Sequence, residues 1–183
     1  QLAEVNAVLA PRTGFEMHPV AGLVSPKAFM DRLDEGVFLS TQYIRHASRP
    51  LYTPEPDVVH EIIGHAPSLL HPSLVRLNRA FGKASKRADP SRIEALIRLY
   101  WYTLEFGVVE EGGALSVVGA GLLSSFGELG RFEREARLRP FTIEEIASTP
   151  FDPTAYQETL FVGPSVDHVV SELVRHLEKI SGA

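Results

Sequence analysis

Residues 91–110 read SRIEALIRLYWYTLEFGVVE, and they carry the strongest helical pattern in the chain. The apolar side chains that recur at helical spacing are Ile93, Leu96, Ile97, Tyr100, Leu104 and Val108. This pattern predicts an amphipathic helix with one buried face. Glu105 lies between Leu104 and Phe106 on that helix. A buried carboxylate is costly unless it is paired or binds a metal, so we expect Glu105 either to pair with a buried arginine or to be a metal ligand.

The flanking segments add further helices and a few short strands. Periodic apolar residues predict helices over 57–63, 72–85 and 165–180, and a proline at its first turn marks a shorter helix over 26–33. Two further helices are expected, one capped by Thr142 with Glu145 three residues later and one that begins near Ser124 or Ser125. The expected strands cover 37–45 and 156–162, with a turn and a short strand in 112–121 and a strand or loop over 20–24.

These elements predict a mostly α fold with a few short strands, an α+β class, in one compact catalytic domain over residues 1–183. Residues 1–12 are expected to be an irregular, turn-rich lead-in. The closing amphipathic helix over 165–180 carries valine and leucine on one side. That side is expected to pack on the domain's own core or on a second copy, which leaves a monomer or a homodimer.

Composition excludes several classes of protein. The 183 residues are 44% hydrophobic and 22% charged, with a formal net charge of −5 and no basic block, so we expect no nucleic-acid partner. No apolar run is long enough for a membrane span, and no signal peptide opens the chain, which fits a cytoplasmic protein. The chain has no cysteine. Any metal must therefore be held by histidine, aspartate, glutamate or backbone oxygen.

Residues 60–65, HEIIGH, place two histidines five positions apart with a glutamate between them. On an ideal α-helix, five residues turn the chain by roughly 500°, so the two side chains would point about 140° apart. Gly64 offers a way to bring them together, because a glycine with positive φ can end a helix. We therefore predict that the helix ends at Gly64 and that His65 swings back toward His60.

Two histidines and one carboxylate, without a thiol, are typical of the facial triad of non-haem Fe(II) oxygenases. His60, His65 and Glu105 are the candidates. A bare histidine pair at this spacing is more often a cap and an ordinary polar residue. A zinc hydrolase would place its histidines four apart.

Longer stretches narrow these alternatives. TQYIRHASRPLYTPEPDVVHEIIGHAP (41–67), LYWYTLEFG (99–107) and GAGLLSSFGEL (119–129) resemble the tetrahydropterin-dependent aromatic amino acid hydroxylases, in family order and spacing. The similarity runs from about Thr13 to about residue 165. It implies the catalytic fold of that family, an iron site of His60, His65 and Glu105, and Fe(II), a tetrahydropterin and O₂ as cofactor and co-substrates.

The resemblance also implies the residues that bind the amino acid. Arg45 matches the arginine that grips the substrate carboxylate, with Asp57 as its partner, and Thr53 matches a contact to the substrate's backbone end. Ser124 belongs to the same region and matches a serine that hydrogen-bonds an iron-ligand histidine. The implied walls of the aromatic pocket are Pro56, Trp101 and Phe106.

On the pterin side the resemblance implies backbone groups near Gly22, Leu23 and Ser25, stacking by Phe29 and polar contacts from Glu61. Tyr100 is close to the iron in the family, so a catalytic role or a structural one is implied. Family members are longer at the N-terminus than the segment before Thr13, so we expect one side of the site to be exposed or covered by another subunit.

The small-molecule partner implied is an aromatic amino acid, phenylalanine first. Trp101 and the SSFGEL stretch resemble the phenylalanine and tyrosine enzymes more than the tryptophan enzyme. The alternatives are the same chemistry on tryptophan or tyrosine, a zinc hydrolase, or a truncated relative that binds amino acid and pterin without turnover.

Overall fold

The helix with the strongest sequence pattern is shorter than predicted. The computed structural model describes residues 2–51, 53 and 55–182, and in it α5 covers Pro90–Tyr100. The chain then widens into a π-helix, η2 (Trp101–Glu105), so the prediction of one helix through Val108 is wrong. Val108 instead begins a strand, in which β-branched side chains pack well.

Helices make up most of the structure, which confirms the predicted mostly α, α+β class. Besides α5 they are α1 (Leu2–Thr13), α2 (Pro26–Leu33), α3 (Ala66–Ser68), α4 (Pro72–Arg87), α6 (Ala120–Ser124), α7 (Phe126–Leu129), α8 (Phe132–Glu135), α9 (Ile143–Ser148), α10 (Val166–Ser181) and the π-helix η1 (His60–His65). The described part of the chain contains no helix long and apolar enough to cross a membrane.

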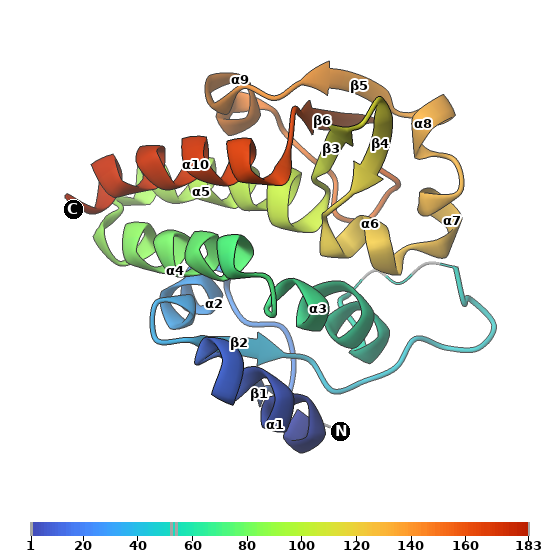
Figure 1. Ribbon diagram of the computed structural model, residues 1–183. Coiled ribbons are helices and arrows are strands. Elements are labelled where there is room, and N and C mark those ends of the chain that lie inside the picture. The colour runs from blue at the N-terminus through green and yellow to red at the C-terminus, as the bar shows by residue number, and fades with distance from the viewer. Residues whose placement is uncertain (1, 52, 54, 183) are drawn as a thin grey trace.

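Helix α4 lies at the centre of the helical layer, with α10 on one side and α2 on the other (Figure 1). The apolar side of α10 is buried there through Val170, Leu173, Val174 and Leu177. The closing helix therefore packs on the domain's own core, which is the first of the two alternatives that the sequence left open.

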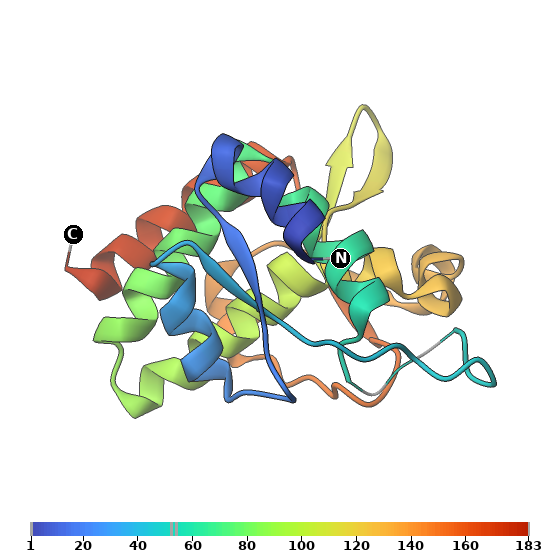
Figure 2. The ribbon, with the colours of Figure 1, turned by 90° about the horizontal axis from the view of Figure 1, so that it is seen from below.

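Two small sheets complete the fold. The strands are β1 (Glu16–Pro19), β2 (Val37–Ser40), β3 (Val108–Glu111), β4 (Ala114–Val117), β5 (Arg137–Pro140) and β6 (Thr159–Gly163). Strands β1 and β2 pair in parallel, and the larger sheet has the order β4-β3-β6-β5. Strands β3 and β4 are antiparallel and joined through Gly112 and Gly113, whose φ angles of 63° and 80° suit a tight hairpin turn. This hairpin projects from the rest of the fold (Figure 2).

The N-terminal region corrects the sequence prediction. Residues 1–12 were expected to be irregular, but Leu2–Thr13 form α1, with Pro11 inside the helix. Proline at position 11 removes one backbone hydrogen bond, that to the carbonyl four residues back, and α1 ends two residues later. Strands β1 and β5 were not predicted, and the expected strand over 37–45 ends at Ser40.

Between Ser40 and residue 58 the described residues form no helix or strand. Residues 41–51 extend away from the helical layer in both views (Figures 1 and 2). This long connection supplies Arg45 to the region between η1 and α6, where the candidate site lies.

Candidate metal centre between two cavities

His60 and His65 lie on one face because η1 is a π-helix. In a π-helix each backbone N–H donates to the carbonyl five residues back. Here the Ala66 N–H donates to the backbone carbonyl of Glu61. Five residues therefore return the chain to nearly the same face. The two imidazole rings lie 4.6 Å apart, and their Nε2 atoms are 2.9 Å apart.

The predicted role of Gly64 is wrong. Gly64 does not end the helix, because it lies inside η1 and α3 follows directly. Gly64 instead allows two helices to come close together, because a Cβ at this position would lie 2.6 Å from the carbonyl oxygen of Ala120 in α6. The absence of a side chain thus lets α6 contact η1.

Glu105 reaches the histidines from a second π-helix. The Phe106 N–H bonds to the Trp101 oxygen, five residues back, at the end of η2. The Glu105 carboxylate places Oε1 at 3.1 Å from His65 Nε2 and Oε2 at 3.5 Å from His60 Nε2. The buried carboxylate therefore pairs with two imidazoles rather than with an arginine.

The donor set fits a metal ion with octahedral geometry. Two donors each about 2.1 Å from an ion and at right angles are about 3.0 Å apart. The separations of 2.9 and 3.1 Å match that value, and the third, between Glu105 Oε2 and His60 Nε2, is longer at 3.5 Å. Three donors on one face of an octahedron leave the opposite face open for other ligands.

The protonation of these groups is compatible with metal binding. Burial lowers the pKa of His60 to about 4, against the opposing pull of Glu105, so its ring is neutral near pH 7. For Glu105, burial acts to raise the pKa, but the neighbouring His65 and His60 lower it overall, and the carboxylate is ionised. Burial opposes protonation of His65, but Glu105 raises its pKa, and a bound cation would displace that proton.

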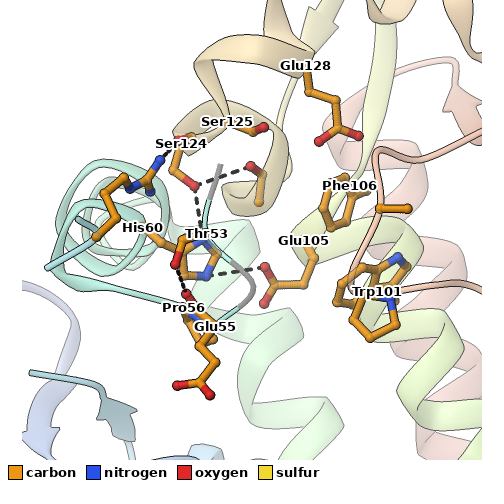
Figure 3. Close-up of a pocket in the computed structure, with 14 residues that line it drawn as sticks. Thr53, Glu55, Pro56, His60, Trp101, Glu105, Phe106, Ser124, Ser125 and Glu128 are labelled. Atoms are coloured by element: carbon orange, nitrogen blue, oxygen red, sulfur yellow. Dashed lines mark hydrogen bonds and ion pairs between the residues drawn. The ribbon is translucent and has the colours of Figure 1, made fainter. Parts of the chain in front are cut away.

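Ser124 fixes the orientation and the tautomer of His60. Its Oγ donates to the Ala120 oxygen at 2.8 Å and lies 2.9 Å from His60 Nδ1 (Figure 3). A hydroxyl has one proton, so Oγ accepts the Nδ1–H of the imidazole. The lone pair of His60 Nε2 then faces Glu105 and His65.

Arg45 and Asp57 form a buried pair at the edge of the first cavity. Arg45 Nε and Nη2 donate to the two Asp57 oxygens at 2.9 and 2.8 Å, and Asp57 is fully buried. Burial acts to raise the pKa of Asp57, but the bonds from Arg45 lower it to about 2. Asp57 Oδ1 also accepts the His60 backbone N–H at 3.0 Å, which links the pair to η1.

The first cavity has a volume of about 180 Å³. Its lining includes Arg45, Thr53, Glu55, Pro56, His60, Trp101, Glu105, Phe106, Gly121, Ser124, Ser125 and Glu128 (Figure 3). Trp101 lies against Phe106 at a ring distance of 4.7 Å and stacks on Phe151 at 4.2 Å. Thr53 Oγ1 donates to the Glu55 carbonyl at 2.7 Å and lies 3.0 Å from the Tyr43 hydroxyl.

A second cavity of about 150 Å³ shares Pro56, His60 and Glu105 with the first. Its lining includes Gly22, Leu23, Phe29, Phe38, Thr41, Pro56, Glu61 and all three candidate metal ligands. Glu61 Oε1 accepts from the backbone N–H and the hydroxyl of Thr41, whereas its buried Oε2 has no hydrogen-bond partner among the described residues. A ligand donor in this cavity would satisfy that oxygen.

Three of the predicted residues line neither cavity. Asp57 acts behind Arg45 as its ion-pair partner. Ser25 accepts the Ala28 N–H and begins α2. Tyr100 directs its hydroxyl to Asn78 of α4 at 3.4 Å, and burial raises its pKa well above the ordinary value. Phe29 lines the second cavity but contacts Phe38 and Tyr100 edge-on.

Sequence reasoning did not single out Glu128 and Gln157. Glu128 belongs to the SSFGEL stretch that carried the resemblance, but no pattern showed that its carboxylate lines a cavity. Gln157 accepts the Trp101 indole N–H at 2.9 Å. Its backbone N–H donates to Glu128 at 2.6 Å across 29 positions of sequence.

Two histidines and one carboxylate whose donor atoms lie within 4.8 Å of one another, beside two cavities, fit the donor set of a mononuclear metal site of the non-haem oxygenase class. The chain belongs to the biopterin-dependent aromatic amino acid hydroxylases, whose family pattern it matches over residues 1–182. The resemblance seen in the sequence is thereby confirmed.

Individual relatives fall into two activities. The chain is 41% identical to Homo sapiens tyrosine 3-monooxygenase over 181 residues, 98% of this chain and 34% of that protein. It is 51% identical to the chloroplastic phenylalanine 4-monooxygenase of Chlamydomonas reinhardtii over 145 residues, 77% of this chain and 40% of that protein. The chain thus spans little more than a third of these relatives.

Solved structures share the fold. Chromobacterium violaceum phenylalanine hydroxylase with bound iron(III) and 7,8-dihydrobiopterin matches with a TM-score of 0.89 at 29% identity, covering 100% of this chain and 68% of that one. The apo phenylalanine hydroxylase of Colwellia psychrerythraea matches with a TM-score of 0.89 at 31% identity, covering 100% of this chain and 72% of that one.

Proposed function

We propose that this protein is an Fe(II)- and tetrahydropterin-dependent monooxygenase that adds one atom of O₂ to the ring of an aromatic amino acid, phenylalanine first. One observation carries the proposal: His60 and Glu105 line both cavities, so the metal ligands form the wall between them. Two co-substrates bound on either side would meet at the same ion.

The metal ligands proposed are His60, His65 and Glu105. When bound, the ferrous ion and the pterin supply the redox chemistry that activates O₂. The three side chains would hold the ion together, and the two adjoining cavities would leave room for its other ligands. Ser124 holds His60 in the tautomer whose Nε2 can bind the metal.

The amino acid is proposed to occupy the first cavity. Arg45 supplies the cation for the substrate carboxylate, and Asp57 keeps its guanidinium in place. Nη1 of Arg45 also donates to the backbone carbonyl of Ser124 at 3.3 Å. The proposed carboxylate site therefore lies next to the serine that hydrogen-bonds His60. Thr53 contributes beside the backbone end of the substrate, and Pro56, Trp101 and Phe106 enclose the ring.

The pterin is proposed to occupy the second cavity. Gly22 and Leu23 offer backbone groups there, and Phe29 offers an aromatic face or edge. The unpartnered Oε2 of Glu61 suits an N–H donor of a heterocycle. Ser25 contributes indirectly, since it caps the helix that carries Phe29. A solved relative with the same fold contains iron(III) and 7,8-dihydrobiopterin, which supports a pterin as the second ligand.

Phenylalanine is favoured over tyrosine by the two aromatic side chains of the first cavity, Trp101 and Phe106. The only polar atom of the Trp101 ring, its indole N–H, is already bonded to Gln157, and Phe106 has none. A site built for tyrosine would be expected to offer the phenol a hydrogen-bond partner, because such partners give strong discrimination. Hydroxylation of tyrosine or tryptophan is the alternative within the same chemistry.

The test is anaerobic loading with Fe(II), followed by phenylalanine, a tetrahydropterin and O₂, with products identified by mass. Tyrosine formed in step with pterin oxidation is expected. Pterin oxidation without a hydroxylated amino acid would contradict phenylalanine as substrate, and tyrosine and tryptophan would then be compared in one mixture. Activity supported by Zn(II) alone would overturn the iron assignment. Binding of iron and amino acid without consumption of O₂ would indicate a relative without turnover.

A further inference from the structure

Glu128 is a buried carboxylate that the proposed chemistry leaves without a role. It lies on α7, its side chain is 6% exposed, and it lines the first cavity. Figure 3 shows its carboxylate pointing into the cavity above Phe106. A buried carboxylate is costly unless it is paired, so its position calls for a cation.

No residue in the described part of the chain supplies that cation. Glu128 forms no ion pair there, and Arg131, the nearest charge that acts on it, is paired with Glu135 at 3.1 Å and lies over the Tyr156 ring. The contacts of Glu128 are neutral donors, the Gln157 backbone N–H at 2.6 Å and the Ser125 side chain. Burial raises the pKa of Glu128, although these hydrogen bonds oppose the rise. A cation that entered the cavity would stabilise the ionised form.

The other carboxylates of this cavity are not suited to a ligand cation. Glu105 is paired with His60 and His65. Glu55 is exposed, and its side chain points away from Glu128 and the cavity interior (Figure 3). Glu128 is thus the carboxylate left to face a ligand.

The cavity also has a cationic end. Arg45 Nη1 donates to the Ser124 carbonyl, and Ser124 precedes Glu128 by four residues across the α6–α7 turn. A cation and an anion therefore border one small cavity with aromatic walls. This arrangement is complementary to a zwitterion that carries an aromatic side chain.

We propose that Glu128 accepts the α-ammonium group of the bound amino acid, so that the site selects free zwitterionic amino acids over carboxylates that lack the amine. The inference rests on the proposed function, because it concerns the amino acid in the first cavity. Gln157 has a positioning role in this arrangement, since it contacts both Glu128 and Trp101 and so links the ammonium site to the aromatic wall.

The experiment measures equilibrium binding of two ligands to the Fe(II)-loaded protein without O₂. L-Phenylalanine carries the ammonium group, and 3-phenylpropanoate keeps the ring and the carboxylate but lacks it. The wild-type protein should bind L-phenylalanine at least tenfold more tightly, a difference of about 1.4 kcal/mol, because 3-phenylpropanoate cannot form the hydrogen bond between ammonium and carboxylate.

Glu128→Gln removes the charge but keeps an oxygen that can accept the Gln157 N–H. It should weaken L-phenylalanine binding about tenfold and leave 3-phenylpropanoate binding unchanged or stronger. The matched control is Glu133→Gln on α8, an exposed glutamate near Glu128 in the chain, which should change neither. Thermal unfolding of each variant would show whether the fold is kept.

The outcomes separate the two proposals. If the wild-type protein binds L-phenylalanine and 3-phenylpropanoate equally, or if Glu128→Gln binds both as the wild type does, Glu128 is not the ammonium site, although the proposed function stands. An equal loss of both ligands in the variant would make Glu128 a structural residue and also overturn the inference. If the wild-type protein binds no aromatic amino acid, the proposed function itself fails. The wild-type comparison needs no variant, so the inference is testable even if Glu128→Gln does not fold.

Discussion

A Cβ on Gly64 would lie 2.6 Å from the carbonyl oxygen of Ala120 and 2.9 Å from its Cβ, so η1 and α6 touch backbone to backbone. This contact joins the segment that carries both histidines to the helix that carries Ser124. The hydrogen bond between His60 and Ser124 depends on that approach. A change at Gly64 should therefore affect both packing and the metal centre.

Gly64→Ala should push α6 away from η1. We expect a loss of about 1–3 kcal/mol in the free energy of unfolding, which is typical of an overpacked interior, and weaker binding of Fe(II). Denaturant unfolding and iron titration measure the two effects. Gly130→Ala is the matched control, because the nearest atom to its Cβ would be the Phe126 oxygen at 3.9 Å and its φ is −77°. Equal stability of the two variants would show that the contact can relax at no cost.

The failure to predict η1 has the same physical origin. The sequence indicated that His60 and His65 needed a special backbone, but the widening of a helix into a π-helix depends on tertiary contacts such as that of Gly64 with Ala120. The second π-helix, η2, also has a close neighbour, since a Cβ on Gly119 would lie 2.3 Å from the backbone carbonyl oxygen of Glu105. Local periodicity does not contain these contacts.

The sequence could suggest His60, His65 and Glu105 as metal ligands, because a chain without cysteine has few other residue types that bind a metal. The sequence could not predict long-range contacts. Glu128 and Gln157 meet only through the fold, and the proline in α1 made a real helix look like a turn. The helices over 26–33 and 165–180 were predicted well because caps and apolar spacing mark them locally.

Glu105→Gln should remove the charged metal ligand while keeping its shape. We expect Fe(II) affinity to fall at least tenfold and hydroxylation to be lost, because an amide is a weaker ligand than a carboxylate. Iron content after gel filtration and product analysis measure both. Glu133→Gln serves again as the exposed control. Wild-type turnover in Glu105→Gln would remove Glu105 from the triad.

A chelator experiment tests whether the site binds metal at all. A ligand that binds only the folded state at 100 times its Kd stabilises that state by about 2.7 kcal/mol. Chelation should therefore lower the unfolding temperature of the iron-loaded wild type and leave that of Glu105→Gln nearly unchanged. An equal shift in both proteins would indicate that the chelator acts elsewhere than at the triad.

Arg45→Lys should separate substrate binding from metal binding. Lysine keeps the positive charge beside the fully buried Asp57 but loses the planar fork that bonds both of its oxygens. We expect the KM for phenylalanine to rise at least tenfold with little change in Fe(II) affinity. Arg45→Ala should be less stable as well, because removal of one partner of a buried ion pair costs about 3–5 kcal/mol. An unchanged KM in Arg45→Lys would contradict the carboxylate role.

Ser124→Ala should act on the metal through His60. The variant removes the acceptor for the Nδ1–H, so the imidazole is free to rotate or to take the other tautomer, in which Nε2 carries the proton. Loss of such a supporting hydrogen bond typically lowers metal affinity by 10- to 100-fold, and we expect a decrease in that range for Fe(II). Ser148→Ala on α9, whose hydroxyl donates only to backbone carbonyls of its own helix, is the control. Because Ser124 also lines the amino acid cavity, iron titration without substrate is the decisive measurement. Unchanged iron affinity together with weaker phenylalanine binding would assign Ser124 to the substrate instead of to the metal.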